Sequence, residues 1–62
     1  MPRFREGTTL RILVAEDDKS IASVLKRRLE AAHYSVDVCH DGGAAYDLLR
    51  LTDYDVAIMD IM

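Results

Sequence analysis

The sequence predicts an α/β fold in which a strand–helix–strand–helix–strand chain forms half of a doubly wound parallel sheet with strand order 2-1-3. The segments 12–15 (ILVA) and 56–59 (VAIM) are continuous apolar runs, as in strands buried on both faces of a parallel sheet. Between these runs, apolar residues recur at helical spacing. Alternation with short connections implies right-handed crossovers, and the order follows if the first strand is central.

In the first half of the chain we expect a flexible arm over residues 1–9, because this stretch carries Pro2 and Gly7 and shows no periodicity. A strand over about 11–15 leads into a helix that Asp17 or Asp18 can cap and that runs to about Ala32. The apolar positions of that helix share one predicted inner face: Ile21, Val24, Leu25, Leu29 and Ala32. His33 falls where the helix should end, at a left-handed position that usually takes Gly or Asn.

In the second half, residues 34–39 alternate as a short edge strand with Val36 and Val38 facing one layer. An Asp-Gly-Gly turn follows, and Asp41 is the expected cap of a second helix. Tyr46 is expected at the margin of that helix. Its predicted inner face is apolar: Ala44, Ala45, Leu48 and Leu49. The third strand is expected over about 56–60.

Composition narrows the function classes. A chain of 62 residues forms at most one domain. The net charge of −3 argues against nucleic-acid binding by this segment, and no apolar run approaches the length of a membrane span. The single cysteine, Cys39, excludes an internal disulfide, which favours a cytoplasmic location and a buried apolar role for that side chain.

Acidic residues follow both apolar runs. The first strand ends at Glu16, Asp17 and Asp18, and the third ends at Asp60. With strand order 2-1-3 these carboxylates face one another, and they repel unless a cation joins them. Mg²⁺ suits such oxygen ligands, and one carboxylate beside it could act as a nucleophile. From the first strand alone, the alternative that its acids only cap the next helix is at least as good.

Three segments carry a family resemblance: LRILVAEDD at residues 10–18, the Asp-Gly-Gly turn and YDVAIMDIM at residues 54–62. Together they resemble the N-terminal half of a response-regulator receiver domain of two-component signalling. The resemblance implies a flavodoxin-like (CheY-like) sheet, a phosphoryl group received from a histidine kinase, and an attached output domain, often one for transcription regulation.

The resemblance also implies residue roles. Asp60 corresponds to the phospho-accepting aspartate. Asp17 corresponds to the direct Mg²⁺ ligand, Glu16 to its neighbouring ligand, and Met62 to a position where the main-chain carbonyl binds the metal. Asp18 is expected to be the helix cap rather than a ligand.

This sequence also departs from the family pattern. His33 replaces a usual glycine, and Tyr46 replaces a usual leucine. A hydroxyl residue after the fourth strand and a lysine after the fifth would lie beyond Met62. We therefore expect residues 10–62 to be a truncated receiver domain, cut within a longer one. It would be a phospho-accepting signalling domain rather than an enzyme, without autophosphatase activity and with impaired phosphotransfer.

The alternative function is a self-associating structural half-domain without phosphotransfer. The third strand would have a partner on one side only, so we expect a homodimer joined at its free edge. Side chains of the first and third strands would then stay partly exposed in one chain: Ile12, Val14, Val56 and Ile58. A metal-dependent hydrolase has little support, because the sequence has no glycine-rich phosphate loop and no histidine cluster.

Overall fold

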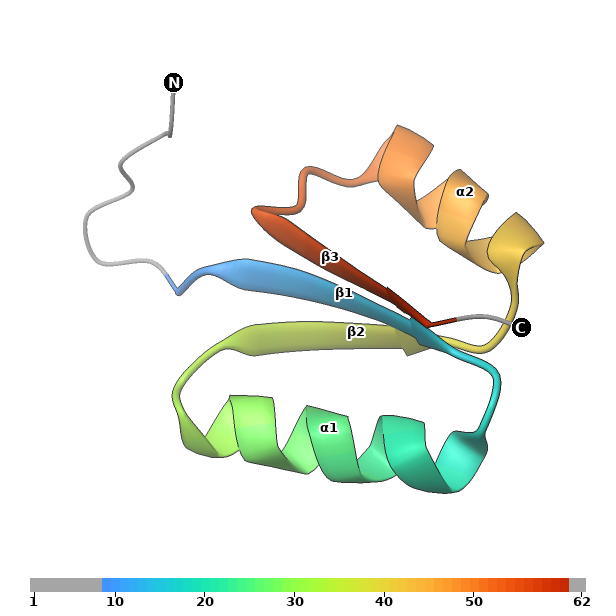
Figure 1. Cartoon of the computed structure of the whole chain (residues 1–62). Helices are drawn as coiled ribbons and strands as arrows, with labels where there is room; N and C mark the ends of the chain where they lie inside the picture. Colours follow the sequence, from blue (N-terminus) through green and yellow to red (C-terminus); the bar gives the residue numbers. More distant parts are fainter. Residues whose placement is uncertain (1–8, 61–62) are drawn as a thin grey trace.

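The computed structural model of the chain describes residues 9–60. The expected arm at residues 1–9 lies outside the described residues except for Thr9, and Met62 lies outside them too. The elements follow the predicted order: β1 (Arg11–Glu16), α1 (Lys19–Ala31), β2 (Ser35–Cys39), α2 (Gly42–Leu51) and β3 (Val56–Asp60) (Figure 1). Within residues 9–60, neither helix is long and apolar enough to cross a membrane.

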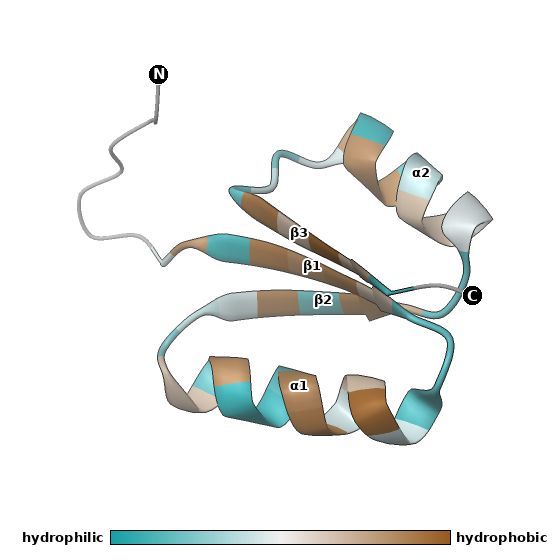
Figure 2. Ribbon diagram, in the orientation of Figure 1, coloured by the Kyte–Doolittle hydropathy of each residue, from teal (hydrophilic) through white to brown (hydrophobic). Residues whose placement is uncertain are grey.

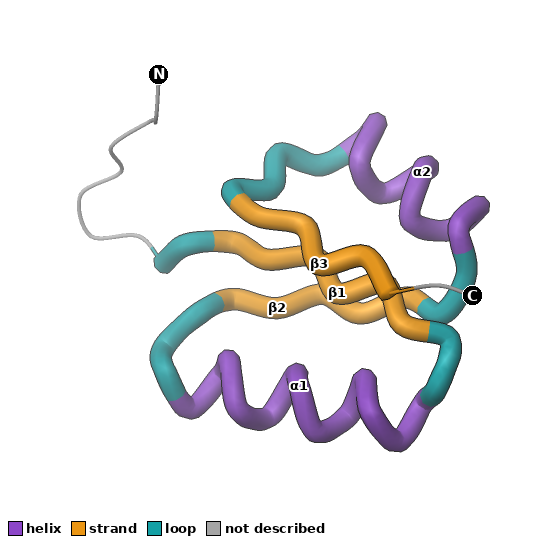
Figure 3. Tube along the Cα trace, in the orientation of Figure 1, coloured by secondary structure: helices purple, strands orange, loops and turns teal. Residues whose placement is uncertain are grey.

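The sheet has the predicted topology. Its three strands run parallel in the order β2-β1-β3, with α1 and α2 on opposite sides (Figures 1 and 3). In the register, Ala15 pairs with Cys39 on one side of β1, and Glu16 pairs with Asp60 on the other. The predicted order 2-1-3 and the parallel βαβαβ fold are confirmed.

The core has two halves, because successive side chains of β1 point to opposite faces. On the α2 side, Leu13 and Ala15 pack with Cys39 and Ala45. On the α1 side, Ile12 and Val14 form the other half together with Val36 and the partly buried Leu25, Leu29 and Ile58. Cys39 is buried and takes the apolar role expected for it.

Two burial predictions were wrong for the central strand. Ile12 and Val14 were expected to be partly exposed, yet they are 5% and 0% exposed. A strand with a neighbour on each side, and a helix over each face, needs no further cover. The expectation holds for the edge strand, where Val56 is 46% exposed and Ile58 is half-buried.

The predicted inner faces of the helices were too wide. Ala22 is the one residue of α1 that is fully buried, whereas Ile21 and Val24 are 47% and 40% exposed, and Ala32 is exposed. On α2 the buried residue is Ala45, and Leu49 is 43% exposed. Small alanines let each helix lie close to the sheet, so only a narrow stripe of each helix is covered.

The helix ends follow the sequence closely. Oδ1 of Asp18 accepts hydrogen bonds from the main-chain N–H groups of Ser20 (2.9 Å) and Ile21 (3.2 Å), which makes Asp18 the cap of α1. Oδ1 of Asp41 accepts from the N–H of Ala44 at 2.8 Å and caps α2 in the same way. Both predicted caps are confirmed.

The C-terminal end of α1 closes in a left-handed turn. His33 has a φ of 72°, the one positive φ among the non-glycine residues described. Its N–H donates to the carbonyl of Glu30 (2.9 Å), and the N–H of Tyr34 donates to that of Leu29 (3.1 Å). This pair of bonds is a Schellman motif, in which glycine is the favoured residue at the position of His33.

Candidate functional site

The acidic residues gather at the edge of the sheet where the parallel strands end, which we call the carboxyl edge. Glu16 is the last residue of β1, Asp60 is the last residue of β3, and the two are partners in the register. Asp17 follows Glu16 directly and is exposed, as is Asp60. The structure thus brings the predicted carboxylates to one edge through the pairing of β1 with β3.

Glu16 is the buried member of this set, with 3% of its surface exposed. Its Oε2 accepts a hydrogen bond from the main-chain N–H of Asp18 at 3.0 Å. Its Oε1 is buried and has no hydrogen-bond partner among the residues described. Leaving a charged oxygen unpaired in this way is costly, so Glu16 has an unmet need for a donor or a cation.

The surroundings of Glu16 act on its pKa in opposite directions. The hydrogen bond from the Asp18 N–H lowers the pKa, but burial and the neighbouring carboxyl groups of Asp17 and Asp60 together outweigh it, so the pKa is raised. Burial, and after it the neighbouring carboxyl groups, thus disfavour the ionised form of Glu16. A bound cation would reverse that preference.

The oxygen ligands at the carboxyl edge fit a hard divalent cation, because Mg²⁺ prefers carboxylate oxygens. Oε1 of Glu16, which has no hydrogen-bond partner among the residues described, is such an oxygen. Within residues 9–60, however, no group of three or more His, Cys, Asp or Glu side chains is arranged to hold a metal. The ligand set Glu16, Asp17 and Asp60 therefore stays a prediction, and the predicted carbonyl ligand of Met62 lies outside the described residues. Asp18 is engaged as the helix cap, as the sequence indicated.

Sequence reasoning missed His40, which lies beside the acids. His40 follows β2 just as Asp17 follows β1, and its Nδ1 lies 3.0 Å from the main-chain oxygen of Glu16. A carbonyl oxygen can only accept, so Nδ1 is the protonated nitrogen and donates this bond. The strand register was the signal that could have found it, because the pairing of Ala15 with Cys39 leads on to Glu16 and His40.

The order of the strands, the register and the acidic carboxyl edge can be compared with known families. The sequence profile described as "Response regulator receiver domain" matches residues 12–62. The chain belongs to this family. The resemblance seen in the sequence is therefore confirmed.

Curated relatives support the assignment. The chain is 38% identical over 53 residues to "Response regulator MprA" of Mycobacterium avium (strain 104), a match that covers 86% of this chain and 23% of that protein. It is 39% identical over 54 residues to "Regulatory protein VanRB" of Enterococcus faecalis (strain ATCC 700802 / V583), covering 87% of this chain and 24% of that protein. The chain thus spans about a quarter of the length of these relatives. The search of solved structures found no match to this chain.

Membership gives the site a context. Receiver domains are phospho-accepting signalling domains that typically use Mg²⁺ and partner with histidine kinases. At its carboxyl edge this chain carries the carboxylates of Glu16, Asp17 and Asp60, and carboxylate oxygens are the kind of ligand that Mg²⁺ prefers.

Proposed function

We propose that this chain is the phospho-accepting part of a response regulator and that Asp60 receives the phosphoryl group from a histidine kinase. The observation that carries the proposal is the pairing of Asp60 with Glu16 at the carboxyl edge, where Oε1 of Glu16 lacks a partner among the residues described. The cytoplasmic location and the attached output domain stay predictions.

In the proposed reaction, a carboxylate oxygen of Asp60 attacks the phosphorus atom of a phosphohistidine. The new O–P bond makes an acyl phosphate while the P–N bond breaks and the leaving imidazole nitrogen takes up a proton. β3 supports this role in two ways: its pairing with β1 holds the main chain of Asp60, and the exposure of Asp60 leaves its carboxylate open to a donor.

The cofactor in this proposal is Mg²⁺, with Glu16, Asp17, Asp60 and the main-chain carbonyl of Met62 as the residues that would hold it. When bound, Mg²⁺ neutralises charge on the carboxylates and on the phosphoryl oxygens. The residues of the chain orient the site. The side chain of Asp18 caps the start of α1. The main-chain N–H of Asp18 holds the side chain of Glu16, and the ring of His40 holds the main-chain carbonyl of Glu16.

The test is phosphorylation by a small phosphodonor, acetyl phosphate, with Mg²⁺, followed by mass spectrometry. We expect one phosphoryl adduct that disappears in Asp60→Asn. Asp47→Asn is the matched control, because Asp47 is an exposed aspartate on α2 away from the carboxyl edge. Loss of the adduct in Asp47→Asn, or its persistence in Asp60→Asn, would contradict the assignment. That residues 10–62 are phosphorylated less efficiently than a complete receiver domain stays a prediction. Labelling a complete receiver domain from a relative under the same conditions tests it.

A second candidate function is self-association through β3, and a specific observation favours it. Within residues 9–60, β3 pairs with β1 alone, and it is apolar along most of its length (Figure 2). Val56 and Met59 are 46% and 52% exposed. An exposed apolar edge strand is a template for pairing with another chain. We propose a two-fold homodimer joined at this edge as the alternative to a monomeric receiver segment.

Sedimentation equilibrium of the 7.0 kDa chain distinguishes the two candidates. The alternative predicts a dimer that Val56→Lys converts to a monomer, because the lysine places a charge at the proposed interface between the two β3 strands. Leu51→Lys is the control, since Leu51 is 78% exposed and belongs to the last turn of α2 rather than to β3. A folded monomer at micromolar concentration would remove the alternative and leave the proposal for Asp60 standing.

A further inference from the structure

Beside the carboxyl edge, α1 and β2 border a hollow of about 230 Å³ that shares only His40 with the proposed phosphotransfer site. We call it the basic hollow, and six residues line it: Lys19, Ala22, Ser23, Lys26, Val38 and His40. Pockets for drug-sized ligands usually measure about 300–1,000 Å³. The basic hollow is therefore suited to a small group rather than to a nucleotide.

The polar lining of the basic hollow comes from one face of α1. Lys19, Ser23 and Lys26 stand at spacings of four and then three residues, so their side chains follow one another along the helix. Ala22 is buried beneath them, and Val38 adds an apolar contact from β2. Two lysines and a serine thus line one hollow together with the buried Ala22 and the apolar Val38.

Among the residues described, few ion pairs engage the two lysines of the basic hollow. Although the chain has a net charge of −3, α1 holds four basic residues and one acidic residue. Lys19 has no ion pair within residues 9–60, and Lys26 shares only an exposed contact with Glu30 at 3.3 Å. An exposed pair at this spacing is weak, so an anion in the hollow can compete with Glu30 for Lys26.

His40 is the fourth polar residue that lines the basic hollow. The Nδ1 of His40 donates to the main-chain oxygen of Glu16, which holds the ring in place beside the cavity. The position on the sheet matters as well. β2 and β3 are opposite edges of the sheet, so a strand that pairs with β3 does not pair with β2, the strand that borders the basic hollow.

We propose that the basic hollow binds a small phosphate-type oxyanion, with Lys19 and Lys26 supplying the charge and Ser23 a hydroxyl donor. Ammonium and hydroxyl groups are the donors that oxyanions accept from, and such charge-assisted hydrogen bonds are the stronger ones. The site is distinct from Asp60, and the proposal does not depend on phosphorylation of that residue.

The test is an NMR titration of the isotope-labelled chain with inorganic phosphate, in the absence of Mg²⁺ and at ionic strength held constant with sodium chloride. We expect saturable shifts of the signals of Lys19, Ser23, Lys26 and His40. Lys19→Gln and Lys26→Gln should each weaken binding about fivefold, the factor that corresponds to one exposed charge contact.

Arg27→Gln is the matched control. It removes the same single charge from the same helix, but Arg27 lines a different surface, with Val24, Arg28 and Ala31. We expect it to change phosphate binding by less than about twofold, as screened surface charges do. Equal weakening by all three variants would show a diffuse electrostatic effect and overturn the site.

A second variant protects the test against loss of folding. Ser23→Asp places a carboxylate in the hollow at an exposed helix position, and it should abolish saturable binding while circular dichroism stays unchanged. Saturable binding that survives in folded Ser23→Asp would overturn the proposal. So would shifts in the unmodified chain that rise linearly without saturation, or that chloride alone reproduces.

Discussion

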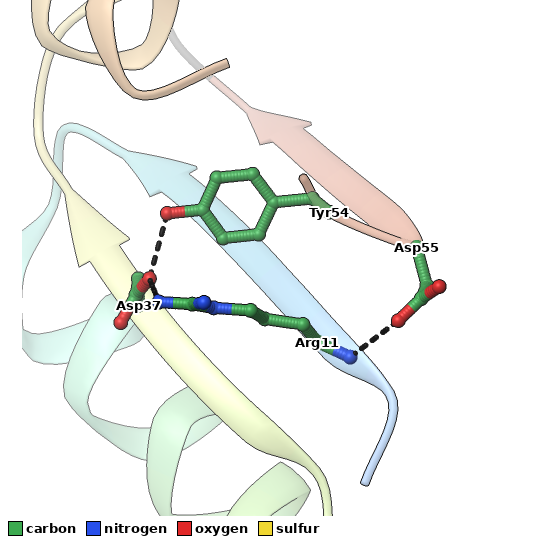
Figure 4. Close-up of polar contacts among 4 residues, drawn as sticks. All are labelled: Arg11, Asp37, Tyr54 and Asp55. Atoms are coloured by element: carbon green, nitrogen blue, oxygen red, sulfur yellow. Dashed lines mark hydrogen bonds and ion pairs between the residues drawn. The ribbon is translucent and has the colours of Figure 1, made fainter. Parts of the chain in front are cut away.

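Tyr54 donates a hydrogen bond of 2.6 Å to Oδ2 of Asp37 across the full width of the sheet, from the start of β3, over β1, to β2 (Figure 4). Arg11 completes the bridge from β1. Its guanidinium lies 5.7 Å from the centre of the Tyr54 ring and 3.4 Å from Oδ2 of Asp37. The main chain of Arg11 also joins Asp55 through bonds of 2.7 and 2.8 Å. This network lies at the opposite end of β3 from Asp60, so it helps to hold the strand that carries the proposed phosphoacceptor.

Tyr54→Phe removes the hydroxyl from this network and leaves the ring in place. A hydrogen bond to a charged group contributes about 1.5–3 kcal/mol, and partial exposure puts the expected loss in the free energy of unfolding near the lower end. Tyr46→Phe is the control, because Tyr46 is 63% exposed and should change stability by less than about 0.5 kcal/mol. Urea unfolding measures both. Equal effects would show that the bond to Asp37 contributes nothing.

The same tyrosine predicts a dependence on alkaline pH. Burial, the hydrogen bond to Asp37 and the charge of Asp37 raise the pKa of Tyr54 above its ordinary value of 10.0. The folded state therefore holds this proton more tightly than the unfolded state. The resulting stability is fully present below pH 10.0 and is lost as the pH rises through the raised pKa. Urea midpoints across this range should fall more steeply for the unmodified chain than for Tyr54→Phe. Parallel curves would contradict the assignment.

Glu16→Gln should stabilise the metal-free protein at neutral pH. The Asp18 N–H lowers the pKa of Glu16, but burial and the carboxyl groups of Asp17 and Asp60 raise it further, so the folded state favours the protonated form. The stability from this proton is present below the ordinary pKa of 4.5 and is lost as the pH rises through the raised value. Gln stays neutral and keeps an oxygen for the Asp18 N–H. We expect a higher Tm at pH 7 without Mg²⁺, and a lower Tm would contradict the account.

The neighbouring aspartates provide a matched pair for the predicted metal site. Asp17→Asn should remove any rise in Tm that Mg²⁺ gives the unmodified chain, because Asp17 is the proposed direct ligand. Asp18→Asn should change that rise little, since Asn caps a helix as well as Asp and Asp18 is engaged with Ser20 and Ile21. Equal effects of the two variants on the Mg²⁺ response would show that the ligand register is wrong.

His33→Gly should make the protein more stable. A left-handed residue with a side chain costs about 1–2 kcal/mol, and the greater freedom of glycine in the unfolded chain offsets part of the gain. We expect an increase in unfolding free energy of about 0.5–1 kcal/mol. Ala32→Gly is the control, because Ala32 has a φ of −89° and gains nothing from glycine. A stability loss in His33→Gly would contradict the role assigned to the left-handed turn.

The elements and their order could be predicted because their signals are local. Continuous apolar runs set β1 and β3, and single aspartates at 18 and 41 set the helix starts. The width of the buried helix stripe could not be predicted. Periodicity includes Ile21 and Val24 as readily as Ala22, and only the approach of α1 to the sheet selects the small residue.

The site shows the same division. Strand order alone predicted that Glu16 and Asp60 share an edge, and the register makes them partners. The bond from His40 to the Glu16 carbonyl joins residues 24 positions apart, and it can be anticipated only once the register of β1 with β2 is known. Whether carboxylates converge on one metal depends on side-chain rotamers, and the sequence leaves these open.

The central claim is that Asp60 is the phosphoacceptor of a receiver domain. The most direct test is to map the adduct formed with acetyl phosphate by peptide mass spectrometry, with and without Mg²⁺. The account predicts one adduct, on Asp60, that requires Mg²⁺. A folded chain that gains no phosphoryl group, or that gains it on another residue, would contradict it.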